Sequence, residues 1–196
     1  MKPSKIGNWK SKKQISINIG EYHASKKPVV IHTLLGSCVS VCLIDEKRRI
    51  GGMNHILLPG RADMRHFDEP ARYGINAMEL LINRILALGG NRRQLAAKVF
   101  GGGNVISSIP SDKAVGKKNV DFILEFLRLE GIRILKKDVG GTDTRKIYFH
   151  TDTGKVYLKR ISSIYQTHLA KEEALKLKRI RKAAGTPGEI TLFDEK

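Results

Sequence analysis

Residues 33–42 read TLLGSCVSVC and residues 51–55 read GGMNH, and together they predict two neighbouring strands. Cys38 comes just after a glycine turn and immediately before the first strand, which runs from Val39 to Ile44, and the second strand carries His55. Two strands joined by a turn can bring side chains that are distant in sequence within hydrogen-bonding reach. A thiol becomes a strong nucleophile when a base or a positive field makes it a thiolate. The pattern therefore predicts a Cys/His nucleophile pair.

The cysteine also has an ordinary explanation, because free cysteine is among the most buried residue types. Gly36 and Ser37 argue for the functional interpretation of Cys38. A glycine turn exposes the side chain that follows and leaves backbone N–H groups free to bind an oxyanion. We therefore take Gly36 and Ser37 as candidate oxyanion or substrate residues. Cys42 lies in the middle of an apolar strand and is interpreted as a core residue.

His55 could equally be a hydrogen-bonded core histidine. Its neighbour Asn54 could hold the backbone or a substrate amide, and it is a further candidate. A catalytic imidazole also needs a group that orients it. Spacing alone does not choose among the nearby candidates, which are His32, Thr33, Ser37 and Ser40.

Composition points to one globular domain without a membrane anchor. The chain has 196 residues, of which 41% are hydrophobic, and its mean hydropathy is −0.27. No apolar run approaches the roughly 18 residues that a membrane span needs. The basic N-terminus lacks the apolar stretch of a secretory signal, so a cytoplasmic protein is expected. Two cysteines form neither a disulfide framework nor a structural zinc site, and no metal or cofactor is expected.

The net charge of +17 favours an acidic partner. Residues 1–20 contain five lysines and no acid, and residues 171–182 contain six Lys/Arg and two Glu. The remaining residues still carry about +8, so the folded body is basic too. The basic residues are not interleaved with aromatic ones, which make up only 6% of the chain. Specific nucleic-acid binding is therefore not expected.

The order of predicted elements is strands, helix, strand, helix, strands. This order implies a single-domain α/β (α+β) sandwich in which helices cover a mixed β-sheet. The expected organisation is a mobile basic tail (1–13), one domain (14–165), and a basic helix with a C-terminal tail (166–196). The last residues, 186–196, are either a docking segment or a segment packed on the domain, and the sequence favours neither.

Seven segments, in consistent order over most of the chain, resemble CheD, the bacterial chemoreceptor glutamine deamidase family. They are residues 20–22 (GEY), 35–42 (LGSCVSVC), 51–59 (GGMNHILLP), 73–74 (YG), 98–103 (KVFGGG), 116–120 (GKKNV) and 138–146, which begins DVGG and ends RK. An ordered set of this kind is far more specific than any single motif.

The resemblance implies a sandwich fold similar to the catalytic domains of deamidating toxins. It implies hydrolysis of chemoreceptor glutamine side chains to glutamate through a thioester, with release of ammonia and no cofactor. Its partners would be the cytoplasmic helices of chemoreceptors and, in some lineages, the phosphatase CheC. By motif, Cys38 would be the nucleophile and His55 the general base.

The resemblance also implies a threonine as the third catalytic residue. The family's threonine typically lies six residues before the cysteine, where an ungapped match places His32. Thr33 lies one residue nearer, and a slip of one residue in a strand moves a side chain to the other face. We expect Thr33, with His32 or a backbone carbonyl as the alternatives. A non-catalytic adaptor of the same fold, binding chemoreceptors or CheC, is the alternative function.

Overall fold

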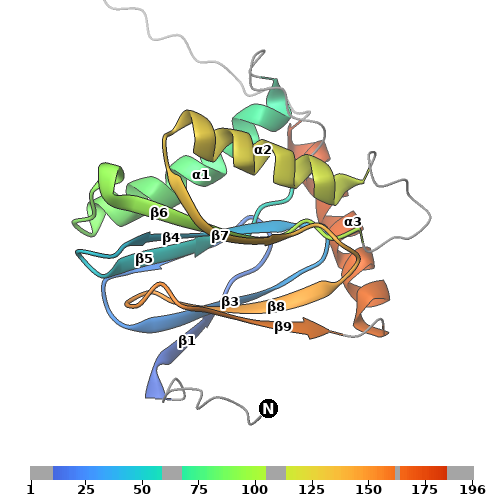
Figure 1. Cartoon of the computed structure of the whole chain (residues 1–196). Helices are drawn as coiled ribbons and strands as arrows, with labels where there is room; N and C mark the ends of the chain where they lie inside the picture. Colours follow the sequence, from blue (N-terminus) through green and yellow to red (C-terminus); the bar gives the residue numbers. More distant parts are fainter. Residues whose placement is uncertain (1–10, 59–67, 105–113, 162–163, 185–196) are drawn as a thin grey trace, which may run out of the picture.

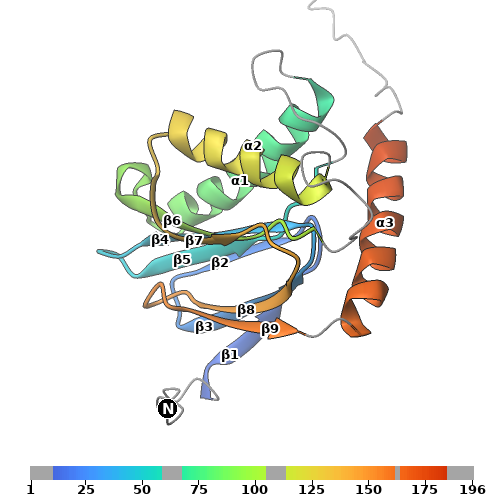
Figure 2. The ribbon, with the colours of Figure 1, turned by 45° about the vertical axis from the view of Figure 1, so that its right-hand side comes forward.

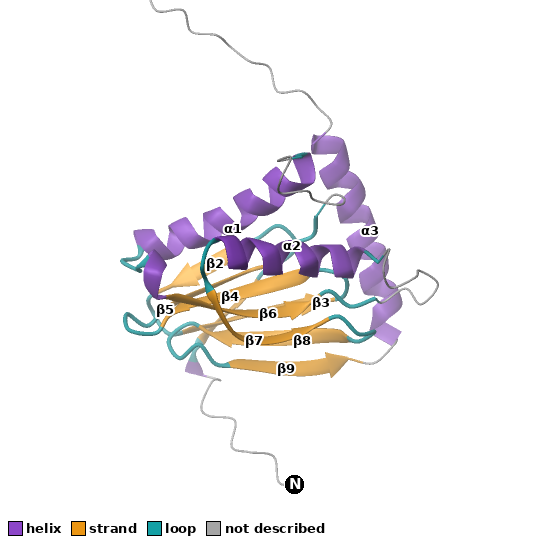
Figure 3. Cartoon of the chain, turned by 45° about the horizontal axis from the view of Figure 1, so that its top comes forward, coloured by secondary structure: helices purple, strands orange, loops and turns teal. Residues whose placement is uncertain are grey.

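The computed structural model describes residues 11–58, 68–104, 114–161 and 164–184, and these form three layers (Figure 1). Two helices lie on one face of a five-stranded sheet, and a four-stranded sheet lies against its other face (Figure 3). The whole C-terminal segment 186–196 lies outside the described residues. No helix in these described ranges is both long enough and apolar enough to cross a membrane.

The strands are β1 (Lys13–Ser16), β2 (Tyr22–Ser25), β3 (Val29–Leu35), β4 (Val39–Asp45), β5 (Ile50–Asn54), β6 (Leu95–Gly101), β7 (Arg133–Val139), β8 (Thr144–His150) and β9 (Val156–Ile161). The helices are α1 (Glu69–Ala87), α2 (Val115–Leu129), α3 (Ile164–Ala184) and the short 3₁₀ helix η2 (Arg92–Gln94). Asp68 caps α1 by accepting from the Ala71 N–H at 2.9 Å, which satisfies one of the free amides of the first turn.

One sheet has the order β2-β5-β4-β6-β7 and the other has the order β1-β3-β8-β9. Alternation along β4 divides its side chains between two cores, because successive residues of a strand point to opposite faces. Val39, Val41 and Leu43 pack against α1 and α2. Cys38 and Cys42, at the other parity, lie in the core between the two sheets.

The expected class, an α/β sandwich of mixed sheets and helices, is confirmed. The sequence did not reveal that the strands divide between two sheets, and β2 was not predicted. Among the described residues β2 pairs with β5 alone, and its YHAS sequence shows little apolar alternation.

At the N-terminal end of the described chain, the Lys12 ammonium donates to the Asp152 carboxylate at 2.6 Å. Lys12 lies within the segment 1–13 that is expected to be a tail.

α3 runs beside one end of the layered body (Figure 2). It therefore lies where the loop before β4, which carries Gly36 and Ser37, reaches the surface. The part of the chain expected to be a basic helix after the domain thus contributes to the site described next.

Candidate active site

Strand register places Cys38 and His55 on the same face of the five-stranded sheet. Val39 and Ile56 form an isolated antiparallel bridge, with N···O distances of 2.9 and 2.7 Å. In this register Cys38 lies opposite Leu57, and His55 is two residues away from Leu57 on the same strand segment. Side chains related in this way are diagonal neighbours within reach of each other. Both point into the region between the two sheets.

Thr33 fixes the orientation and the tautomer of His55. The Thr33 hydroxyl donates its one proton to the carbonyl oxygen of Ile17 at 2.7 Å. Its Oγ1 lies 2.8 Å from His55 Nδ1, so this nitrogen must carry a proton and donate it to Thr33. The other ring nitrogen, Nε2, is then the basic one. It is buried and has no hydrogen-bond partner among the described residues.

The alternative orienting residue, His32, lies on the other face of β3. Thr33, together with Ile31 and Leu35, follows the parity that points between the sheets. His32 is half-buried on the outer face, where its ring lies 5.7 Å from that of Tyr148. The structure therefore brings Thr33, and not His32, to the imidazole without any bulge in β3.

Both cysteines are fully buried free thiols. Burial raises the pKa of Cys38 well above its usual value, and the charge of Glu173 and a hydrogen bond to that carboxylate raise it further. Burial also raises the pKa of Cys42. The difference is that Cys38 lies just before β4, in the loop with Gly36 and Ser37, whereas Cys42 lies in the middle of the strand. In this state the thiol of Cys38 is held protonated.

The backbone of residues 36–38 forms a concave cluster of N–H groups, as the glycine turn predicts. Its occupant is the carboxylate of Glu173, on α3. The Gly36 N–H donates to Glu173 Oε1 at 3.2 Å, the Ser37 N–H to both oxygens at 3.1 Å, and the Cys38 N–H to Oε1 at 3.4 Å. The Ser37 hydroxyl donates to Oε2 at 2.5 Å. Such a cluster of amides binds a negatively charged oxygen.

The carbonyl groups of the same loop accept hydrogen bonds from the glycine turn that follows β6 and from α2. The Gly102 N–H donates to the Cys38 carbonyl at 2.7 Å, and the Gly103 N–H to the Gly36 carbonyl at 2.8 Å. Asn119, on α2, donates to the Ser37 carbonyl at 2.9 Å. With their carbonyls occupied on this side, the N–H groups of residues 36–38 are directed towards α3.

Asn54 is not brought to the cysteine. Its side chain points to the opposite face from His55, where Oδ1 accepts from the Val41 N–H at 2.9 Å. Its Nδ2 donates towards the Ala77 carbonyl at 3.4 Å. The carboxamide thus joins β5 to β4 and α1, and its expected place in a substrate site is not what the structure shows.

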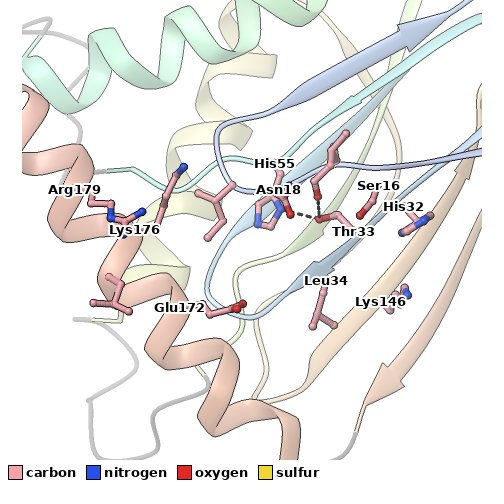
Figure 4. Close-up of a pocket in the computed structure, with 13 residues that line it drawn as sticks. Ser16, Asn18, His32, Thr33, Leu34, His55, Lys146, Glu172, Lys176 and Arg179 are labelled. Carbon is pink, nitrogen blue, oxygen red and sulfur yellow. Dashed lines mark hydrogen bonds between the residues drawn. The ribbon is translucent and has the colours of Figure 1, made fainter.

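A cavity of about 420 Å³ lies between α3 and the body of the protein, next to His55 (Figure 4). Thr33, His55, His32 and Lys146 line the body side, and Glu172, Lys176 and Arg179 line the α3 side. In the described part of the chain, no group of three or more His, Cys, Asp or Glu side chains is placed to hold a metal ion. The arrangement suits nucleophilic chemistry at a carbonyl carbon.

Two residues of the site were missed by reasoning from the residue pattern, namely Glu173 and Asn119. Glu173 is one of two adjacent glutamates in a basic helix, a pattern typical of a solvated face. Asn119 was noticed only as part of a segment of the resemblance. Neither position has a periodicity or spacing that relates it to residues 36–38, which are far away in sequence.

His55 should make the protein less stable in acid. Burial lowers its pKa from 6.5 to about 4, and a hydrogen bond to the Ile17 carbonyl partly opposes this effect. The unfolded chain then binds more protons than the folded one between these two values, so stability falls as the pH falls from 6.5 towards 4. At pH 4.5 the loss relative to pH 7 should be about 2 to 3 kcal/mol from this group.

Urea unfolding at several pH values measures this effect, with His55→Gln as the comparison. His23, His32 and His150 also have pKa values lowered by burial, but they contribute to both proteins alike. The unfolding free energy of the wild type should therefore decline more steeply than that of the variant. Parallel curves would show that the imidazole is not desolvated.

The family model described as CheD chemotactic sensory transduction matches residues 57–160. A protein of Methylobacillus flagellatus named probable chemoreceptor glutamine deamidase CheD is 43% identical over 177 residues, which are 89% of this chain and 86% of that protein. The chain belongs to the CheD family.

Other CheD relatives also match most of this chain and most of their own length. A protein of Shewanella oneidensis named probable chemoreceptor glutamine deamidase CheD 1 is 41% identical, covering 92% of this chain and 88% of its own length. A protein of Chromobacterium violaceum named probable chemoreceptor glutamine deamidase CheD 2 is 48% identical, covering 72% and 71%. The resemblance stated from the motifs is thus confirmed at the level of the family.

Proposed function

We propose that this chain hydrolyses glutamine side chains of chemoreceptors to glutamate and releases ammonia. The observation that carries the proposal is the hydrogen-bond chain Ile17–Thr33–His55, which leaves Nε2 unprotonated on the face shared with Cys38. The names of the relatives supply the substrate class.

In the proposed reaction, His55 Nε2 takes the proton of the Cys38 thiol and the sulfur attacks the carboxamide carbon of glutamine. The carbonyl oxygen becomes negatively charged, and the N–H groups of residues 36–38 donate to it. His55 returns the proton to the departing nitrogen, so that ammonia leaves and a thioester remains. Water then gives a proton to His55, attacks the thioester, and yields glutamate and the free thiol.

The basic body favours an acidic substrate surface. We place the substrate on the cytoplasmic helices of chemoreceptors, and the phosphatase CheC as a second partner, both in the cytoplasm. Electrostatic attraction of this kind is screened by salt, so the rate of receptor modification should fall as ionic strength rises.

The test is mass spectrometry of a cognate chemoreceptor cytoplasmic fragment incubated with the protein. Each converted glutamine should add about one mass unit, because a carboxamide becomes a carboxylate. Peptide mapping then identifies the residue that is modified. If the folded protein binds several cognate receptors and modifies none of them, the adaptor function is favoured instead.

Thr33 acts in this scheme as a positioning residue for His55. Thr33→Val keeps the size of the side chain but removes the oxygen that accepts from Nδ1. Losing a buried hydrogen bond to the imidazole should lower kcat roughly 10- to 100-fold. KM should change little, because Thr33 does not contact the substrate in this scheme.

Thr33→Ser is the matched control, because it keeps the hydroxyl. Its kcat should stay within about threefold of the wild type. Steady-state kinetics of ammonia release on the receptor fragment measures both variants. Equal losses in the valine and serine variants would contradict the orienting role and point to packing.

A further inference from the structure

The described part of α3 contacts the body mainly through one carboxylate. Among the side chains of α3 that the structure describes, at residues 171–180 and 182, only Glu173 is buried, at 5% exposure. Leu177 packs partly against the core between the sheets, whereas Leu175 is 62% exposed. The described side chains of α3 therefore bury little apolar surface, and a contact of this kind can open at modest cost.

The carboxylate of Glu173 occupies the positions that the proposed reaction needs for its substrate. It accepts from all three N–H groups of residues 36–38 and from the Ser37 hydroxyl. Its charge also raises the pKa of the Cys38 thiol, the attacking group of that reaction. A glutamine side chain must place its carbonyl oxygen in this same cluster, with its carbon beside the sulfur.

A glutamate side chain is also the product of the proposed reaction. Here it is presented by a helix, as the receptor side chains would be. We propose that α3 occupies the binding site of the substrate helix, with Glu173 in the position of the product carboxylate. A receptor helix must then displace α3 to react. The inference rests on the proposed function and adds to it the site at which the substrate helix docks.

Two features of the resting site follow from this occupancy. The charge of Glu173 helps to keep the pKa of the Cys38 thiol high, while His55 Nε2 has no partner among the described residues. When α3 leaves, the negative charge beside the sulfur leaves with it, and the thiol is free to turn to His55. His32 and Lys146 remain on the body side of the opened cavity, where Lys146 can attract acidic residues of the arriving helix.

The sharpest test is the variant Glu173→Gln, which converts the occupant from product to substrate. Cys38 should attack the new carboxamide carbon, the carbon–nitrogen bond should break with loss of ammonia, and water should hydrolyse the thioester to glutamate. The purified variant should therefore carry glutamate at position 173, about one mass unit above the encoded sequence. Because the reaction is intramolecular, its rate should not depend on protein concentration.

Two matched variants control this experiment. In the double variant Cys38→Ala/Glu173→Gln the carboxamide should persist, because the nucleophile is absent. Glu172→Gln places a carboxamide one residue away, on the cavity side of α3, and it should persist as well. If the wild type modifies the receptor but the carboxamide at position 173 survives, Glu173 is not in the product position and the inference is overturned.

A second readout needs no catalysis. Glu173→Ala removes the negative charge that raises the pKa of the Cys38 thiol, so iodoacetamide should alkylate Cys38 roughly tenfold faster or more. Peptide mapping separates Cys38 from Cys42, and Glu172→Ala should leave the rate unchanged. An unchanged rate in Glu173→Ala overturns the inference, whatever the receptor assay shows. Absence of receptor modification by the wild type counts against the proposed function instead.

Discussion

Replacing Cys38 with alanine should lower the rate of receptor deamidation by at least about 1,000-fold. The sulfur is the atom that forms the bond to the carboxamide carbon, and no other described side chain near residues 36–38 offers a comparable nucleophile. The Ser37 hydroxyl lies closest along the chain, but its proton is donated to the Glu173 carboxylate, which leaves the site with α3 in the proposed reaction. Ammonia release and receptor mass should both report the loss.

Cys42→Ala is the control for this variant. Cys42 is equally buried and lies in β4, four residues after Cys38 and at the same parity, so both substitutions remove one sulfur from the core between the sheets. The Cys42 variant should lose some stability and keep its activity within a few-fold, because its thiol lies away from the loop at residues 36–38. Equal activity in the two variants would exclude Cys38 as the nucleophile.

Replacing Gly101 with alanine should destabilise the fold and distort the site together. Gly101 has φ +108°, and a Cβ there would lie 2.2 Å from the carbonyl oxygen of Cys38. Steric overlap with backbone costs about 1 to 3 kcal/mol or more, and a positive φ adds about 1 to 2 kcal/mol. The unfolding free energy should therefore fall by about 3 kcal/mol or more, which urea unfolding measures.

The same substitution should reduce kcat, because relief of the overlap moves the Cys38 carbonyl away from the Gly102 N–H that it accepts from. Gly89→Ala separates the cost of a positive φ from the cost of steric overlap. Gly89 has φ +95°, but nothing lies within 4 Å of the position that a Cβ would take. It should lose only the conformational cost, about 1 to 2 kcal/mol, and retain full activity. Equal losses in both variants would contradict the steric argument.

Much of the fold was predictable, because most strands carry a local pattern. The β-branched residues of β3 and β4 and the helical spacing of apolar residues in α1 reflect which faces are buried, and burial is what shapes such patterns. The weak pattern of β2 was missed because a short edge strand buries little. The division into two sheets depends on pairing between distant strands, such as β3 with β8, which no local pattern encodes.

Within the site too, some features follow from local sequence pattern and others depend on contacts between distant segments. The sequence by itself determined the nucleophile candidate, the base candidate and the glycine turn, because these residues are chemically distinctive and adjacent to strands. The register of β3 against β1 and β8 decided that Thr33, rather than His32, meets His55, since a strand directs neighbouring residues to opposite faces. Only the tertiary structure placed Glu173 in the amide cluster of residues 36–38. A contact between residues so far apart in sequence depends on where the folded layers end and where α3 can lie against them.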